Sequence, residues 1–185
     1  MPLPEPPVLE TQRLRVRAFR EADLDDIQVV HSDDETTFHL PCGTWRTEED
    51  RKRWHDRIRV MLTAGTGVQF VLEERATGRV IGACVVFRYD EESARAEIGY
   101  VLGRAHWGLG LMREALEAVV AHAFGAWGIR RLEAEVDPDN VRSDRVVRSL
   151  GFVEEGRLRK RWRARDRIYD ARIFGLLREE WRPRS

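Results

Sequence analysis

A strand-to-helix turn built around two glycines constrains the fold of this chain more than any other feature. The segment HWGLGLMREAL (106–116) places Gly108 and Gly110 one residue apart, after the strand-like run AEIGYVL and before an amphipathic helix pattern. Glycine brings bare backbone N–H groups to the turn, and the positive end of the helix dipole points at the same place. The sequence therefore predicts that an anion binds at this turn.

Hydrophobic patterns on both sides of the turn predict a mixed α/β chain. Strands are expected at 13–19, 68–74, 79–88, 95–102, 131–136, 152–163 and 167–177. Helices are expected at 23–31, from Thr47 onward, from 111 to a C-cap at Gly128, and from a cap at Asp139 or Asn140 to Gly151, with a loop over 39–45. This order predicts one mixed sheet with helices on both faces.

The helix that begins after Thr47 has a start signal and an apolar face. Thr47 and Asp50 form a capping box, with acidic residues in the first turn. Its apolar face is predicted from the spacing of Trp54, Ile58, Met61 and Leu62.

Length and composition favour one soluble domain. A chain of 185 residues suffices for a single core, which we place at 9–178 between an N-terminal tail (1–8) and a C-terminal tail (179–185). The net charge of zero argues against generic nucleic-acid binding. No signal peptide or membrane-spanning run is seen, and Cys42 and Cys84 have no metal-ligand spacing. A reducing cytoplasm is the expected location, although a single disulfide stays open.

Three interpretations of the glycine turn can be weighed from its residues. A phosphate-binding NTPase loop needs a Lys and a Ser or Thr after the last glycine, but Leu111 and Met112 come after Gly110. A dinucleotide fingerprint needs a third glycine where this chain has Arg113, and the repeated βαβ context is missing, although Glu133 is suitably spaced for a ribose contact. The third interpretation is that the glycines only permit tight helix–strand packing.

Motifs that follow one another in a set order favour a more specific interpretation. The series AEIGYVL, HWGLGLMREAL and EAEVDPDNVRSDRVVRSLGF resembles the GNAT superfamily of acyl-CoA N-acyltransferases. LETQRLRVRAFREADLDDI and RDRIYDARIFGLL are similar to the opening and closing segments of its RimJ/RimL branch of ribosomal-protein N-terminal acetyltransferases. The resemblance spans about residues 9 to 178. It implies a GNAT fold, α/β (α+β), with a mostly antiparallel sheet of about seven strands, splayed between the fourth and fifth.

The resemblance implies that main-chain amides of the loop hold the pyrophosphate of acetyl-CoA. The five histidines show no metal-ligand spacing, so no metal is expected. Ala105 stands where the family has Arg or Gln, which removes one side-chain contact but keeps the backbone cradle. Trp107 would either flank the cofactor or support the turn as a buried aromatic residue. The cofactor-binding residues implied are Tyr100, Val101, Leu102, Trp107, Gly108, Leu109, Gly110, Leu111, Met112, Asn140 and Ser143.

Glu97 is the candidate base. Alternation places Glu97, Gly99 and Val101 on one side of their strand, opposite Tyr100. In the resembling branch the matching glutamate faces the substrate, so Glu97 would accept the amine proton directly or through water. The alternative is an exposed strand glutamate without a catalytic role. A main-chain N–H of the same strand would polarise the thioester carbonyl.

Ser143 is the candidate partner of the leaving thiolate. Many GNAT enzymes place a tyrosine acid seven residues after the motif asparagine, where this chain has Val147. The N-x-x-S pattern of the branch is present as Asn140 and Ser143. Ser143 would therefore protonate or orient the sulfur. The alternative is a plain helix cap with Ser143 in the first turn.

The acceptor side is implied by the resemblance and by one charged strand. The acceptor pocket should be bordered by the 38–45 loop, and its candidate residues are Phe38, His39, Trp45 and Asp170, the last of which would otherwise anchor a hairpin. RLRKRWRARDR (157–167) predicts an arginine stripe from Arg157 to Arg163 that ends at a turn over 164–166. This stripe is either a protective edge strand or a grip on an acidic acceptor, on ribosomal RNA, or on the coenzyme's 3′-phosphate.

The leading hypothesis is an N-acetyltransferase that moves an acetyl group from acetyl-CoA directly to a primary amine, at a protein or peptide N-terminus. A small amine such as an amino acid, polyamine or aminoglycoside is the alternative acceptor. A catalytically idle acyl-CoA-binding module and a dinucleotide-binding protein are the alternatives of another class. No membrane partner is expected, and the resemblance is compatible with a homodimer.

Overall fold

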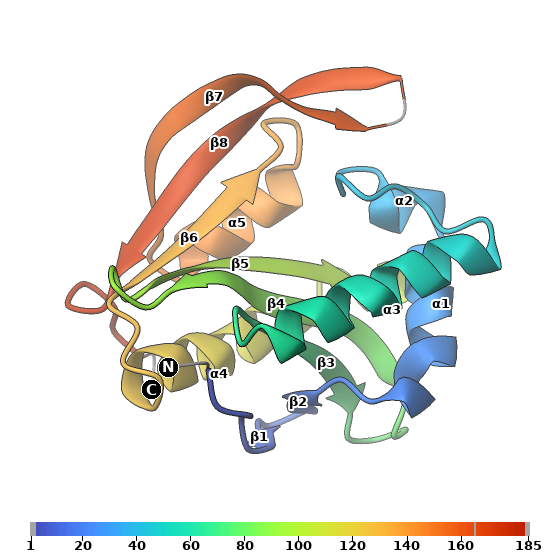
Figure 1. Cartoon of the computed structure of the whole chain (residues 1–185), viewed down its shortest axis with the longest axis horizontal. Helices are drawn as coiled ribbons and strands as arrows, with labels where there is room; N and C mark the ends of the chain where they lie inside the picture. The colour runs from blue at the N-terminus through green and yellow to red at the C-terminus, as the bar shows by residue number, and fades with distance from the viewer. Residues whose placement is uncertain (1–2, 165, 184–185) are drawn as a thin grey trace.

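The computed structural model describes residues 3–164 and 166–183. Arg165, in the turn expected after the arginine stripe, and the outer ends of both expected tails therefore lie outside the described residues. One eight-stranded sheet runs through the molecule in the order β1-β2-β3-β4-β5-β6-β8-β7 (Figure 1). Its strands are β1 (Leu9–Glu10), β2 (Leu14–Ala18), β3 (Val68–Glu74), β4 (Val80–Asp90), β5 (Arg95–Leu102), β6 (Arg131–Val136), β7 (Val153–Ala164) and β8 (Arg167–Leu177).

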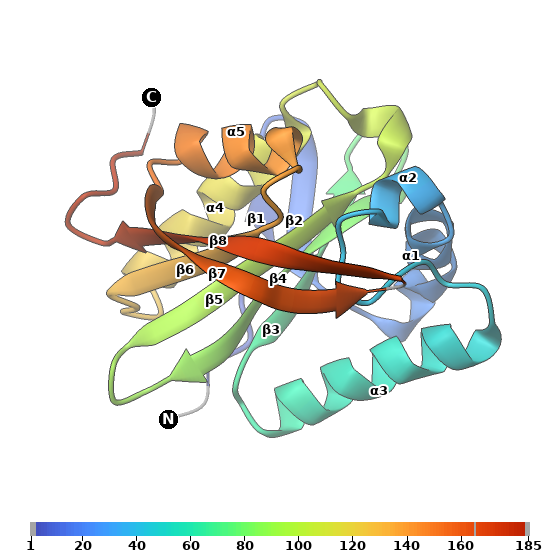
Figure 2. The same ribbon diagram turned by 90° about the horizontal axis from the view of Figure 1, so that it is seen from above.

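Helices cover both faces of this sheet, as predicted (Figure 2). They are the 3₁₀ turns η1 (Glu21–Asp23) and η2 (Arg104–His106) and the helices α1 (Leu24–His31), α2 (Asp34–Thr37), α3 (Glu48–Thr63), α4 (Leu111–Gly125) and α5 (Val141–Ser149). The predicted capping box at the start of α3 is confirmed. Asp50 N donates to Thr47 Oγ1 over 3.3 Å, and Thr47 N donates to Asp50 Oδ2 over 3.0 Å.

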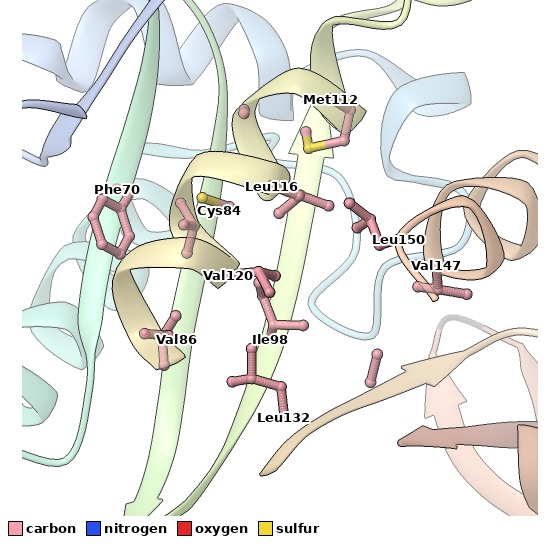
Figure 3. Packing of buried hydrophobic residues seen from close by; sticks show 14 of the residues in the cluster. Phe70, Cys84, Val86, Ile98, Met112, Leu116, Val120, Leu132, Val147 and Leu150 are labelled. Atoms are coloured by element: carbon pink, nitrogen blue, oxygen red, sulfur yellow. The ribbon is translucent and has the colours of Figure 1, made fainter. Parts of the chain in front are cut away.

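Two buried clusters lie on opposite faces of the sheet. The larger one packs α4 and α5 against the strands, and Figure 3 shows Met112, Leu116 and Val120 of α4 facing Cys84 and Ile98. The smaller cluster packs α1 and α3 against β3 and β4 through residues that include Ile27, Trp54, Ile58 and Val71. The sheet is thus the middle layer of a three-layer domain.

A gap opens in the sheet between β5 and β6. These strands are parallel neighbours, and they pair only at Arg95↔Arg131, Ala96↔Leu132 and Glu97↔Glu133. Beyond Glu97, β5 continues to pair with β4 as far as Leu102, but its pairing with β6 has ended. The expected splay between the fourth and fifth predicted strands is therefore found at this place.

Several local expectations differ from the structure. The short strand β1 and the helix α2 were not expected from the sequence. The prediction that Gly128 caps the long helix is wrong, because α4 ends at Gly125 with Ala126 as its C-cap. The prediction that Leu62 lies on the apolar face of α3 is also wrong, since it is 47% exposed. The spacing of apolar residues predicts which face of a helix is buried, but it does not predict how far the sheet covers the end of the helix.

The arginine stripe is interrupted earlier than expected. The β7–β8 register shifts between Leu158 and Trp162, and Lys160 has a φ of 50°. Such a bulge re-aims the side chains that come after it. Arg157 pairs with Asp170 on β8, whereas Arg161 reaches Glu135 on β6. The odd-numbered arginines therefore do not form one continuous stripe.

His31 ends α1 inside an aromatic cluster. Its ring stacks on Trp45 with centroids 4.4 Å apart, and the ring of Trp54 lies 5.8 Å away. Neither ring nitrogen has a hydrogen-bond partner among the described residues. Burial, assisted by the nearby charge of Arg57, lowers the pKa of His31 to about 4.

Acidification from pH 6.5 to pH 4 is expected to destabilise the fold through His31. The unfolded chain protonates this side chain near pH 6.5, whereas the folded chain keeps it neutral down to a pKa of about 4. The contribution of the neutral ring to stability is complete above the pKa of the unfolded chain. As the pH falls toward the folded pKa, the free energy of unfolding decreases by about 3 kcal/mol. Urea denaturation at several pH values gives the free energy of unfolding as a function of pH. Between pH 6.5 and pH 4 this free energy should fall less steeply for His31→Phe than for wild type, and equal slopes would contradict this account.

Candidate active site

A cavity of about 820 Å³ passes through the sheet at the gap between β5 and β6. Glu97 and Gly99, which lie on one face of β5, line it together with Ile98 and Tyr100 from the other face. The same cavity is lined by Trp54 and Ile58 of α3 and by Ser143 of α5. The cavity therefore connects the α3 side of the molecule with the α5 side.

The β5 edge supplies backbone groups to this cavity. From Ile98 to Leu102 the strand pairs with β4 on one side, whereas its pairing with β6 on the other side stops at Glu97. Backbone N–H and C=O groups in such a position need partners. This edge can therefore bind amide or carbonyl groups of an extended ligand.

Tyr100 of β5 and Ser143 of α5 are hydrogen-bonded to each other across one side of the gap. The Tyr100 hydroxyl lies 2.7 Å from Ser143 Oγ and also donates to the Ser143 carbonyl oxygen over 3.3 Å. Burial raises the pKa of Tyr100 above its ordinary value, which keeps the phenol neutral, although the Ser143 bond opposes this shift. Asn140 caps α5, because its Oδ1 accepts from Ser143 N over 3.1 Å. The two hydroxyls and the Asn140 side chain thus meet at the cavity wall.

The glycine loop presents open backbone at the start of α4. Gly108 and Gly110 have φ values of 76° and 77°, and a Cβ added at Gly108 would meet nothing within 4 Å. Leu109 is 56% exposed, and its carbonyl oxygen accepts from Arg13 Nη1 over 2.8 Å. Free N–H groups of the first helical turn and the helix dipole both favour an anion here. Residues 105–112 do not line the cavity, so the loop is a separate outer part of the site.

Trp107 lies between this loop and the buried core. Its indole Nε1 donates to the Leu102 carbonyl oxygen over 2.7 Å, and its ring packs against the larger core cluster. The guanidinium of Arg142 lies 4.3 Å from the centre of the same ring. Of the two roles expected for Trp107, the geometry favours support of the turn. Arg142 adds a positive charge beside the loop that no sequence motif indicated.

Glu97 faces the cavity but is already ion-paired. Both of its carboxylate oxygens accept from Arg88 Nη1, over 2.9 and 3.0 Å, and its side chain is 12% exposed. Arg88 itself has a left-handed backbone with a φ of 52°. The alternation expected along β5 is confirmed, because Val101 packs on the α1–α3 cluster while Tyr100 reaches α5.

His39 brings a second proton acceptor to the cavity. Its Nδ1 lies 2.7 Å from Oδ2 of Asp137, whose side chain is only 1% exposed. Both residues line the cavity. Sequence reasoning missed Asp137, although an aspartate directly after a strand beside the expected gap was a usable signal.

The other acceptor-side candidates lie outside the cavity lining. Trp45 is buried in the smaller core cluster, and Phe38 is 47% exposed with the Arg167 guanidinium 4.9 Å from its ring centre. Asp170 accepts from Arg157 Nε and from the Lys160 backbone N–H, which anchors the β7–β8 hairpin. Of the four expected residues, only His39 lines the cavity.

Metal sites and membrane spans are both absent from residues 3–164 and 166–183. In this part of the chain, no group of three His, Cys, Asp or Glu side chains is placed to hold a metal ion. None of the helices described there is long and apolar enough to cross a membrane. Cys42 is exposed and Cys84 is buried, and the two are not joined by a disulfide.

Comparison with known proteins gives one consistent result. A family model described as "Acetyltransferase (GNAT) domain" matches residues 13–153. The chain is 34% identical over 173 residues to the protein named "Uncharacterized N-acetyltransferase p20" of Bacillus licheniformis, and the match covers 94% of this chain and 97% of the relative.

Two more distant relatives act on different acceptors, as their names state. The ribosomal-protein-serine acetyltransferase of Escherichia coli (strain K12) is 26% identical over 132 residues, or 71% of this chain and 73% of the relative. The crystal structure of spermidine N-acetyltransferase from Vibrio cholerae in complex with CoA and spermine superposes with a TM-score of 0.80, covering 92% of this chain and 98% of that one. Its identity is 18%, so this likeness shows the fold alone.

Tyr100→Phe and Ser143→Ala are expected to be non-additive. Each removes one end of the same 2.7 Å hydrogen bond, so each should lower the free energy of unfolding by about 1 kcal/mol. The double variant should lose less than the sum, with a coupling energy of at least about 0.5 kcal/mol. Urea denaturation of the four proteins measures this cycle. Strict additivity would show that the bond does not stabilise the wall of the cavity.

Proposed function

The chain belongs to the GNAT family of N-acetyltransferases and is an acyl-CoA-dependent acetyltransferase, and we propose that its acceptor is the α-amine of a protein or peptide N-terminus. The observation that carries this choice is the charge state of the cavity. Its three carboxylates already have cationic or imidazole partners: Glu97 with Arg88, Glu135 with Arg161, and Asp137 with His39 and Arg167.

A polyamine needs several carboxylates that are not neutralised by the protein itself. The cavity offers none among the described residues that line it, and Arg57 adds a further positive charge at its wall. A chain terminus presents one amine followed by neutral peptide groups. The paired cavity suits this acceptor better, since only one ammonium must enter and lose its proton.

The β7–β8 hairpin also supports a polypeptide acceptor. In Figure 1 this hairpin extends away from the sheet on the side where α2 and the loop after it lie. Trp162 and Tyr169 of the hairpin line the cavity, while Leu158 and Ile168 are exposed on it. Exposed apolar side chains on a hairpin that also lines the cavity would provide contacts for the residues that come after an N-terminus.

The outer part of the site fits acetyl-CoA. The open backbone at Gly108 and the first turn of α4 would hold the pyrophosphate, with Arg142 nearby. The β5 edge and Asn140 would hold the pantetheine arm. Acetyl-CoA supplies an activated acetyl thioester, so these residues need only bind, orient and exclude water. Ser143 and Tyr100, joined by their hydrogen bond, would protonate or orient the sulfur.

Gly108→Val is expected to weaken acetyl-CoA binding at least about tenfold. The new side chain would project into the open space at the loop, where the pyrophosphate is proposed to lie. Gly128→Val is the matched control, because Gly128 also has a positive φ (66°) and open space around it but lies beyond the end of α4. Both variants carry similar backbone strain. Titration calorimetry with acetyl-CoA measures the difference, and equal affinities in the two variants would refute the proposed cradle.

A free N-terminus is expected to be the preferred amine. Thiol release should be compared for short peptides beginning with Ser or Ala, the same peptides with a formylated N-terminus and an internal lysine, and spermidine. The free peptides should exceed spermidine in kcat/KM by about tenfold or more, a margin of about 1.4 kcal/mol. Equal rates with the formylated peptides, or faster turnover of spermidine, would contradict the proposed acceptor.

A further inference from the structure

We infer that His39, oriented by Asp137, is the base that takes the proton from the acceptor amine. This inference rests on the proposed function and adds a catalytic residue to it. His39 comes from the loop after α2, and Asp137 lies just past the end of β6 at the gap. The two residues are 98 positions apart in the sequence and meet at the cavity wall.

The hydrogen bonds fix the tautomer of His39. Asp137 Oδ1 accepts from the Asp139 backbone N–H over 3.0 Å, and Oδ2 faces His39 Nδ1 over 2.7 Å. An ionised carboxylate can only accept, so Nδ1 must carry the hydrogen of the neutral ring. Nε2 then has a free lone pair, which makes it the proton acceptor.

Asp137 is built to hold this orientation. It is almost completely buried, and Arg167 Nη2 lies 3.4 Å from the same oxygen that faces His39. Arg167 also approaches Asp139, at 3.3 Å, and so balances the negative charge at the end of β6. A buried carboxylate that orients an imidazole and stabilises its protonated form is a recurrent arrangement for general-base catalysis.

Glu97 is less suited to this step. Both of its oxygens accept from Arg88 Nη1, so proton transfer to this carboxylate would have to compete with that ion pair. The other charged side chains at the cavity are Arg57 of α3 and Glu135, which is held by Arg161. His31 also lines the cavity and has no hydrogen-bond partner among the described residues, but it is only 3% exposed and its ring is stacked on Trp45. The His39 side chain is 22% exposed and is oriented by Asp137, so it is the better placed proton acceptor.

The proposed step conserves protons and electron pairs. The acceptor ammonium gives one proton to His39 Nε2, and the imidazolium is stabilised by Asp137. The amine lone pair forms the C–N bond while the C–S bond breaks. The second proton of the nitrogen passes to the sulfur, with Ser143 and Tyr100 as the nearest hydroxyls, and His39 later returns its proton to water.

His39→Gln tests this role, because Gln is polar and of similar size but has no basic ring nitrogen. The probes are acetyl-CoA and the peptides with a free Ser or Ala N-terminus. At pH 7 kcat/KM should fall at least about 100-fold, with Asp137→Asn intermediate. The loss should shrink toward pH 9, where an α-amine is largely neutral without a base. His55→Gln, outside the cavity, is the matched control and should keep the wild-type rate.

The tautomer provides a readout that does not depend on the acceptor. Imidazole nitrogen NMR should show Nδ1–H for His39 in the wild type and a mixture in Asp137→Asn. Near-wild-type kcat/KM for His39→Gln, or a loss that stays constant from pH 7 to pH 9, would overturn the inference. If none of the peptides is acetylated by the wild type although acetyl-CoA binds, the proposed acceptor fails, and the NMR result alone then decides whether the oriented dyad exists.

Discussion

β5 and β6 share three residue pairs and then part. Parallel neighbours in the middle of a sheet would normally continue their ladder, because unpaired backbone groups are costly when buried. β5 leads into the glycine loop and α4, whereas β6 leads into Asp137 and the cap of α5. The gap places backbone donors, a tyrosine–serine pair and a histidine–aspartate pair around one cavity.

The charges around this cavity arise from the same constraint. A passage through the sheet exposes strand residues whose side chains are polar, and partly buried charges are stable only when they are paired. Three arginines neutralise these carboxylates. Arg88 pairs with a carboxylate on β5, Arg161 with one on β6, and Arg167 with one just past the end of β6. The bulge at Lys160 contributes to this pairing of charges, because Arg161 reaches Glu135 only after the register of β7 has shifted.

The sequence was most informative where local physics decides the structure. Alternation predicted β3 and β5 with their observed bounds. Thr47 marked the start of α3, and of the two caps expected for α5, Asp139 and Asn140, the structure uses Asn140. The glycine turn and the splay were expected from the sequence and its resemblance to GNAT proteins, and the structure contains both. The remainder of the site depends on contacts between distant segments. Nothing near His39 in the sequence indicates Asp137, because their pairing requires the α2–α3 loop to lie against the end of β6.

Amide NMR during titration with coenzyme A tests the central claim most directly, because the claim is that one ligand occupies both the loop and the gap. The backbone signals of 99–102, 108–112 and 140–143 should shift together along one binding curve. Signals of α3 and of the β3–β4 turn should change little. Shifts confined to the loop, or no shifts at millimolar coenzyme A, would show that the gap between β5 and β6 is not the place where the thioester is held.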